Sequence, residues 1–465
     1  MRRLGPLWTY GLLTLGFVAA MILVLFQGIR QFGGTSGPSA EGSPWASFVE
    51  TLHTPLALML MQVIVIVLVA RAAGQLFAKF NQPPVIGEMF AGIALGPSLV
   101  GSVFPQFSAF VFPKESLLNL SMLSQVGVIL FMFVVGMELD TRMLRQKAQT
   151  AILVSHTSIF LPFLLGLASS LFLFKNYSGT STHFLPFALF MGISMSITAF
   201  PVLARIIQDR GLTGTQLGNT AITCAAVDDI TAWCSLAFIV AIAKSQTLAG
   251  SFLTVLLSLV IVVVVFGLVR PALQRMSDTL PDPAQPGKGP VMAALLVVFL
   301  CALATEAAGI HALFGAFIAG VAMPKSPEFR HFVRERLEYF STLFLLPIFF
   351  AFTGLRTHLG LLEGGTDWLV CGYLLLIAVG GKLGGSALAA RFTGVSWRES
   401  LALGALMNTR GLMELIALNL GLDLGVLSPK IFAMLVLMAL ITTFSTGPIV
   451  SWLGYGQGLR SKSPA

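Results

Sequence analysis

Long apolar segments separated by short polar stretches fill this chain of 465 residues from end to end. Each segment is roughly 16 to 28 residues long, close to the length that a helix needs to cross the hydrocarbon core of a bilayer. There are about fourteen such runs, at residues 10–28, 55–70, 84–100, 117–138, 149–174, 185–204, 216–243, 250–269, 289–305, 310–323, 340–355, 368–390, 400–421 and 430–452. The pattern predicts an all-α polytopic membrane protein with about 13 to 14 transmembrane helices.

The composition supports the same class and gives an orientation. The chain is 56% hydrophobic and 10% charged, whereas a soluble domain carries about 25% charged residues. With the N-terminus inside, roughly 20 of the 28 basic residues fall in cytoplasmic segments and about six outside, as the positive-inside rule requires. The net charge of +8 is therefore a signal of topology, so we expect membrane lipid and no nucleic acid as a partner.

Two linkers organise the chain, one at residues 31–44 and one at 276–290 that divides the chain into two halves. A Gly-, Ser- and Pro-rich loop at 31–44 separates an N-terminal helix and flexible external loop (1–52) from a transmembrane domain at 53–452, which a short tail at 453–465 follows. Within that domain six spans that start outside (about 53–245), a linking helix (about 250–270) and six spans that start inside (about 289–452) form inverted six-helix repeats. An amphipathic segment at 326–340 is expected to lie as a helix in the cytoplasmic interface.

The two halves of an inverted repeat usually place their site near the bilayer midplane, where broken helices expose backbone groups. In the present chain two adjacent aspartates, Asp228 and Asp229, lie near the centre of the run at 216–243. A helix over this run is about 40 Å long at ~1.5 Å per residue, so both carboxyls fall near mid-membrane. An ionised acid there costs about 2.5–3.5 kcal/mol on insertion scales, and such residues usually line an ion or proton path.

Each half also offers a candidate broken helix in the fifth of its six spans. In residues 194–205, Pro201 removes a backbone donor, and Ser196 and Thr198 supply hydroxyls in the preceding turn. In residues 404–415 the apolar pattern is interrupted by Asn408, Thr409, Arg410 and Gly411. The guanidinium needs acceptors such as freed carbonyls, Glu414 or an aspartate. A plain proline kink and a packed glycine are the structural alternatives.

Lys382 lies about 15 residues into its run, too deep to reach the interface easily. It therefore needs a buried anion, and a lysine about 4 Å from an aspartate gains roughly 4 kcal/mol at an effective permittivity of ~20. The four glycines around it, Gly380, Gly381, Gly384 and Gly385, permit close approach of another helix. A structural salt bridge with no part in transport is the alternative.

Seven motifs in this order resemble the monovalent cation:proton antiporters of the second cation:proton antiporter family, from about residue 53 to residue 452. They are QPPVIGEMFAGIALGPSLVG (82–101), VGMELD (135–140), TAFPVLAR (198–205), AVDDITAW (226–233), FFAFTGLRT (349–357), GGKLGG (380–385) and MNTRGLMELI (407–416). The resemblance implies a sodium/proton antiporter-like fold with two crossed discontinuous helices. It also implies a core domain and a dimerisation domain that move past each other, and a homodimer.

Carried over to this chain, the resemblance implies that Asp229 is the principal carboxylate for the transported Na⁺ or K⁺ and for protons. Asp228 is then its partner, paired with Lys382 in the ion-free state, and Thr198 completes the site. The crossing of the broken helices comprises Ala199, Phe200, Pro201, Asn408, Thr409, Arg410 and Gly411. Members with two acids here tend to exchange ions with net movement of charge.

The expected activity is secondary antiport, in which protons and Na⁺, Li⁺ or K⁺ exclude one another at one carboxylate. No cofactor and no enzymatic reaction are expected, and the protein is placed in the bacterial inner (plasma) membrane with both termini cytoplasmic if the first helix is retained. A sodium-coupled symporter of an organic solute and a channel or sensor of the same fold are the alternatives. An intramembrane aspartyl protease needs its acids on two helices, whereas these two are adjacent.

Overall fold

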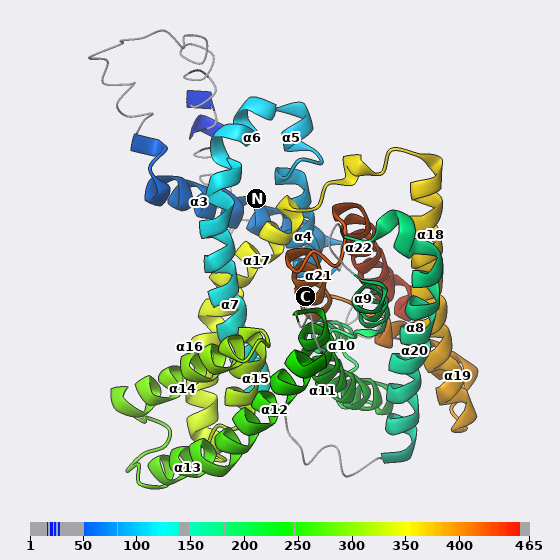
Figure 1. The fold of residues 1–465 in the computed structure, drawn as a ribbon. Coiled ribbons are helices and arrows are strands. Elements are labelled where there is room, and N and C mark those ends of the chain that lie inside the picture. The colour runs from blue at the N-terminus through cyan, green and yellow to red at the C-terminus, as the bar shows by residue number, and fades with distance from the viewer. Residues whose placement is uncertain are drawn as a thin grey trace, which may run out of the picture. The chain divides into compact units, whose positions relative to one another are not determined.

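A computed structural model describes residues 51–80, 82–138, 148–179, 183–244 and 248–455, with scattered positions between 16 and 27. The described chain is helical almost throughout and divides into two compact units. Unit 1 comprises Met1–Phe80, Pro84–Gln125 and Phe344–His358, and unit 2 comprises Asn81–Pro83, Val126–Leu343 and Leu359–Ala465. Figure 1 shows the order of the helices along the chain.

Unit 1 is built from α3 (Pro55–Lys79), α4 (Pro84–Leu95), α5 (Val100–Val103), α6 (Pro105–Val111), the start of α7 (Leu117–Glu138) and α17 (Leu346–Leu355). Helix α4 packs very closely on its neighbours through glycine: a Cβ on Gly92 would lie 2.5 Å from backbone atoms of Ala351. The buried amide of Gln62 donates to the Val111 carbonyl oxygen and to the Ser116 hydroxyl, at 2.8 and 2.6 Å. These contacts hold α3, α4, α6 and α17 together.

Unit 2 carries the remaining helices. They are the end of α7, α8 (Ala148–Tyr177), α9 (Phe184–Ser196), α10 (Phe200–Asp209), α11 (Gln216–Lys244), α12 (Leu248–Val264), α13 (Arg270–Asp278), α14 (Lys288–Ala307), α15 (Ala312–Val321), α16 (Pro327–Phe340), α18 (Gly365–Val379), α19 (Gly385–Phe392), α20 (Trp397–Met407), α21 (Leu412–Asp423) and α22 (Pro429–Trp452). Helix α8 packs against α9, α11 and α19, and α20 packs against α11 and α22. The predicted site residues all lie in this unit.

The described spans follow the apolar pattern, although they are fewer than the 13 to 14 predicted. Among the described residues, 11 helices are long and apolar enough to cross a membrane, or up to 12 if the bent pair α20 and α21 counts as one span. The short run at 310–323 corresponds to α15, a shorter apolar helix of 10 residues. Every predicted run from residue 55 onward has a counterpart here, and the run at 10–28 lies mostly outside the described residues. The all-α, span-rich fold is confirmed.

The segment predicted to be a helix at 326–340 is helical: α16 spans Pro327–Phe340. Helix α16 continues through a π-helical turn, Ser341–Leu345, so that one helical stretch of 35 residues runs over Pro327–Leu361. Pro347 follows this turn at the start of α17. A proline has no N–H to donate to the preceding turn.

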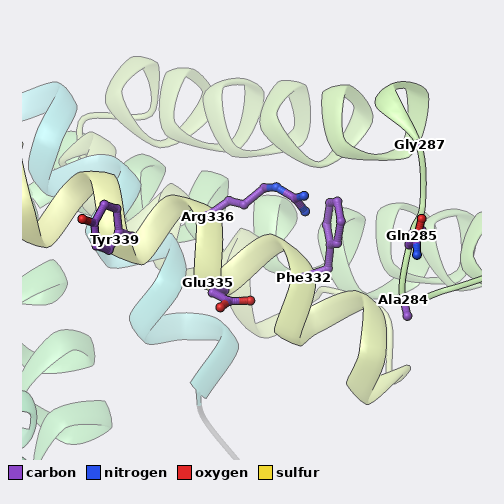
Figure 2. Close-up of a pocket in the computed structure, with 7 residues that line it drawn as sticks. All are labelled: Ala284, Gln285, Gly287, Phe332, Glu335, Arg336 and Tyr339. Carbon is purple, nitrogen blue, oxygen red and sulfur yellow. The ribbon is translucent and has the colours of Figure 1, made fainter.

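A surface hollow of about 890 Å³ lies between α16 and the linker that follows α13. Figure 2 shows Phe332 and Arg336 turned to the same side of α16, with the guanidinium carbon 3.4 Å from the centroid of the ring. The linker contributes Ala284, Gln285 and Gly287. None of the predicted site residues lines this hollow, which is therefore separate from the site described next.

Candidate functional site

The first predicted break is present in the structure. Helix α9 ends at Ser196 and α10 begins at Phe200, and the backbone between them is extended, with φ and ψ of −68° and 136° at Ile197 and of −89° and 94° at Ala199. Pro201 lies at the start of α10. Its fixed φ suits the first turn of a helix and its missing N–H cannot bond back to α9, so the helix restarts here and does not continue.

The second predicted break is present as well. Helix α20 ends at Met407 and α21 begins at Leu412, and the two helices are bent by 43° at the break. The four residues that join α20 to α21, Asn408 to Gly411, are not helical. A Cβ on Gly411 would lie 2.8 Å from Val202 Cγ2 and 3.2 Å from Ala199 Cβ, so a residue without a side chain lets the two breaks meet.

The two breaks are joined by hydrogen bonds. The Ala199 N–H donates to the Thr409 carbonyl oxygen at 3.0 Å. The Thr198 hydroxyl lies 3.2 Å from the Met407 carbonyl oxygen at the end of α20. Extended backbone from two distant parts of the sequence therefore crosses at one point, where it satisfies part of the hydrogen bonding that each broken helix lacks.

Two basic side chains cover the carboxyl end of α9. Arg410 donates to the carbonyl oxygens of Ser194 and Met195, at 2.6 and 2.8 Å, and to the Glu414 carboxylate at 3.0 Å. The Lys382 ammonium donates to the Ser196 carbonyl oxygen at 2.5 Å. A helix carboxyl end carries partial negative charge and unpaired carbonyls, so both cations are stabilised there although neither is exposed.

Lys382 lies in a π-helical turn, Gly380–Gly384, between α18 and α19. Of the four glycines around it, two meet α8: a Cβ on Gly381 would lie 3.1 Å from Pro162 Cα, and one on Gly385 would lie 2.9 Å from Leu161 Cδ2. A Cβ on Gly380 or Gly384 would meet nothing within 4 Å. The close approach predicted for the glycines is therefore made by two of the four.

Asp228 is fully buried, and both of its carboxylate oxygens are occupied. Ser155 donates to Oδ1 at 2.5 Å, and Ser158 donates to Oδ2 at 2.9 Å. The Thr198 hydroxyl lies 2.7 Å from Oδ2, and the Lys382 ammonium lies 3.5 Å from it. The carboxylate has one ion pair and as many as three hydroxyl donors.

Asp229 has a different environment, although it is the next residue of α11. Its side chain is 4% exposed and accepts a hydrogen bond from the backbone N–H of Phe200, the first residue of α10. Oδ1 has no hydrogen-bond partner among the described residues. A carboxylate at a helix amino terminus is favourably placed for negative charge. One buried carboxylate oxygen of Asp229 is therefore left without a hydrogen-bond partner in the described part of the chain.

The predicted residues thus lie together, with one difference in detail. The hydroxyl of Thr198 faces Asp228 and the second break, and no hydrogen bond from it to Asp229 is seen in the described part of the chain. Asn408 is buried beside the crossing, and its Oδ1 has no hydrogen-bond partner there.

The sequence reasoning missed Ser155 and Ser158. The available signal was a pair of serines three residues apart, and so on one helical face, in the run at 149–174. Among the described residues, no group of three or more His, Cys, Asp or Glu side chains could hold a metal ion.

Comparison with known proteins identifies relatives over most of the chain. The model of the family described as sodium/hydrogen exchanger, transmembrane, matches residues 64–454. The Na⁺/H⁺ antiporter NhaS4 of Synechocystis sp. is 47% identical over 396 residues, which cover 85% of this chain and 97% of that protein. The K⁺/H⁺ antiporter 1 of Saccharomyces cerevisiae is 33% identical over 423 residues, 88% of this chain and 48% of the yeast protein.

A plant relative extends the same comparison. Cation/H⁺ antiporter 17 of Arabidopsis thaliana is 38% identical over 424 residues, 90% of this chain and 52% of its own length. The chain spans about half the length of these plant and yeast relatives. The solved structure of the sodium proton antiporter MjNhaP1 from Methanocaldococcus jannaschii covers 86% of this chain with a TM-score of 0.62 at 14% identity, and so has the same fold. Together, the match over residues 64–454 and the similarity to NhaS4 show that this chain belongs to the sodium/hydrogen exchanger family of transmembrane proteins.

Proposed function

We propose that the chain exchanges a monovalent cation, Na⁺ or K⁺, for protons across the membrane by alternating access, with Asp229 carrying either ion. The observation that carries the proposal is Oδ1 of Asp229, which has no hydrogen-bond partner among the described residues and is buried beside two crossed helix breaks. A proton and an alkali cation cannot occupy one carboxylate together, so each displaces the other. Relatives named as Na⁺/H⁺ and K⁺/H⁺ antiporters support the same assignment.

The charges around the site give the exchange a physical basis. Five ionisable side chains are buried here: the acids Asp228, Asp229 and Glu414 and the bases Lys382 and Arg410. In their ionised forms the acids exceed the bases by one charge, and an uncompensated buried charge is costly. One proton or one monovalent cation removes that excess. Moving the site through a low-dielectric region therefore costs less free energy when a proton or a cation is bound than when the site is empty. This difference couples the two ion fluxes.

The same proposal extends to the organisation of the protein. Residues 53–452 form the exchanger domain, with a core and a dimerisation part, in a homodimer with both termini in the cytoplasm of a bacterial cell. The distribution of Lys and Arg supports this orientation. The segment Leu256–Asp278 is apolar and only 11% buried, so it offers a surface to lipid or to a second copy of the chain.

A pH-gradient assay in everted vesicles tests the function. Addition of Na⁺, Li⁺ or K⁺ should release protons with the wild-type protein and with the control Asp278→Asn, a change at the end of α13, remote in sequence from the breaks. Asp229→Asn should abolish the response at equal protein level and with an unchanged melting temperature. Because no organic solute is added, a response also separates antiport from sodium-coupled symport. Equal responses with Asp229→Asn and the wild type would reject the site.

A further inference from the structure

A buried tryptophan lies one helical turn beyond the acid proposed to carry the ion. Trp233 follows Asp229 by four residues on α11, so the two side chains share one face of the helix. Trp233 is 1% exposed. Its ring lies against two rings of α15: the centroid of Phe314 is 5.4 Å away, edge to face, and that of Phe317 is 6.0 Å away, stacked at 25°. Three aromatic side chains therefore cover α11 next to the acid.

Helix α15 is packed firmly against the helices behind it. A Cβ on Gly315 would overlap the Cys301 carbonyl oxygen of α14, and a Cβ on Gly320 would overlap the Phe133 carbonyl oxygen of α7. Glycine permits such close approach of two backbones, and packed helices of this kind move together. The two phenyl rings of α15 therefore have a firm base, and they separate from α11 only when the helices themselves move apart.

The two halves of α11 differ on either side of the acids. Beyond Trp233 the same face continues with Leu236 and Val240, both fully buried. Before the acids, the polar residues Asn219 and Thr223 are not buried. A buried apolar face gives a hydrated ion no partner. The closed side of the site is therefore the side toward the end of α11.

The indole N–H of Trp233 has no hydrogen-bond partner among the described residues. A buried tryptophan usually has one, because an unpaired donor loses the hydrogen bond that it makes with water. Phe314 and Phe317 contribute packing but no oxygen or nitrogen atom. The closed arrangement therefore carries a free-energy cost, and this cost disappears once water reaches the indole.

We propose that Trp233 is a gate on the side of Asp229 toward the end of α11, and that its unpaired N–H keeps this gate easy to open. The proposal rests on the proposed function and adds a positioning residue to it. The distribution of basic residues makes this side the external one. Trp233 neither binds the ion nor exchanges a proton; it sets the fraction of molecules in which the site is open to the outside.

A gate of this kind affects the two faces of the membrane unequally. An ion that arrives from outside binds only the open fraction, so its apparent KM rises as that fraction falls. Trp233→Phe keeps an aromatic ring against α15 and removes the unpaired donor, which favours the closed arrangement. The usual cost of an unpaired buried donor makes the expected change about tenfold. An ion that arrives from the cytoplasm does not pass the gate, so its apparent KM should not change.

The test uses the full chain in right-side-out and in everted membrane vesicles, so that Na⁺ or K⁺ is presented to one face at a time. Apparent KM is measured on each face for the wild type, Trp233→Phe and the matched control Trp452→Phe, at a tryptophan that is 84% exposed. We expect Trp233→Phe to raise KM about tenfold on the external face alone. The control should match the wild type on both faces.

Two results would overturn the proposal: an external KM that is unchanged in Trp233→Phe, or an equal rise on both faces, which would mark a general distortion of the site. If Trp233→Phe does not fold, Phe317→Leu removes the stacked ring and should lower the external KM, because the gate then opens more easily. An unchanged or raised external KM in folded Phe317→Leu would also refute the gate. Failure of the proposed function is distinguishable, because it would show as no cation-dependent proton movement in the wild type or as full activity of Asp229→Asn.

Discussion

The Lys382 ammonium lies 2.5 Å from the Ser196 carbonyl oxygen and 3.5 Å from the Asp228 carboxylate. Its shortest contact is therefore with the end of a broken helix, and the contact with the acid is longer than the two contacts with Ser158, at 3.1 Å each. One positive charge compensates both the unpaired carbonyl of α9 and the carboxylate of α11. The end of α9 and Asp228 are thus held by the same side chain.

Two replacements of Lys382 should separate its contact with the Ser196 carbonyl oxygen from its ion pair with Asp228. Lys382→Gln keeps a donor for the Ser196 carbonyl oxygen, so we expect a folded protein that retains exchange with an altered pH profile. Lys382→Met leaves the Asp228 carboxylate without its ion pair, and removal of one partner of a buried pair costs about 3–5 kcal/mol. Thermal unfolding of the purified proteins measures the difference. Lys430→Met is the control, because that side chain is 36% exposed and its pair with Asp367 should contribute about 0–1 kcal/mol.

The pair between Arg410 and Glu414 should show strong coupling. Arg410→Met leaves the Glu414 carboxylate and the two carbonyls of α9 without their donor, so a large loss of stability is expected, whereas Glu414→Gln keeps an acceptor for the guanidinium. A double-mutant cycle should give a coupling above about 1 kcal/mol. The exposed pair of Arg205 and Asp209, cycled in the same way, should give about 0.5 kcal/mol or less. Equal couplings in the two cycles would contradict the assigned role of the buried pair.

Gly404 should be intolerant of alanine. A Cβ there would lie 2.4 Å from the Leu383 carbonyl oxygen, so α20 would have to move away from the turn that carries Lys382. We expect Gly404→Ala to lower both the melting temperature and the exchange rate. Gly384→Ala, at a position with nothing within 4 Å, is the control and should be neutral or stabilising by up to about 1 kcal/mol. A melting temperature that is unchanged in Gly404→Ala would show that the helices can separate at no cost.

The stability of the protein should respond to mild acid through His311. This residue caps α15, its Nδ1 accepting from the Leu313 N–H at 3.5 Å. Burial lowers the pKa of the imidazole, against the raising effects of Glu306 and Asp423 and with the lowering effect of Lys244. Since the folded pKa lies below the unfolded value of about 6.5, this cap contributes fully above that pH and is lost as pH falls through the folded pKa.

The measurement is the melting temperature between pH 7 and pH 5. In His311→Asn, which keeps a capping side chain that does not titrate, the decline with acid should become shallower by the equivalent of about 1 kcal/mol. His331→Asn serves as the control, because that side chain is 66% exposed and pairs with Glu335 one turn along the same helix. A decline as steep in His311→Asn as in the wild type would assign the acid sensitivity elsewhere.

The spans and both breaks could be predicted because lipid imposes strong rules on sequence. Twenty or so apolar residues are needed to cross a bilayer, so Pro201 and the polar group at 408–411 are visible as exceptions inside such runs. A buried lysine and two buried acids are equally visible, since each needs a partner. These signals are local to one run and do not depend on how the runs pack.

Side-chain partners within the site could not be predicted in the same way. Ser155 and Ser170 are identical residues on one helix, yet one hydroxyl binds Asp228 and the other its own backbone, because only packing decides which face meets α11. Adjacent residues on a helix point about 100° apart, so Thr198 could reach one of the two aspartates, and the sequence does not state which. For the same reason Gly381 meets α8 and Gly380 meets open space.

The distance in sequence between Asp228 and Lys382 affects how the protein is made. The acid is synthesised 154 residues before its counter-ion, so at about 5–20 residues per second a ribosome needs about 8–30 s to reach the lysine. During that interval the helix with both aspartates exists without Lys382. Ser155 and Ser158 of α8 are made before Asp228, so they can donate hydrogen bonds to its carboxylate before Lys382 is synthesised.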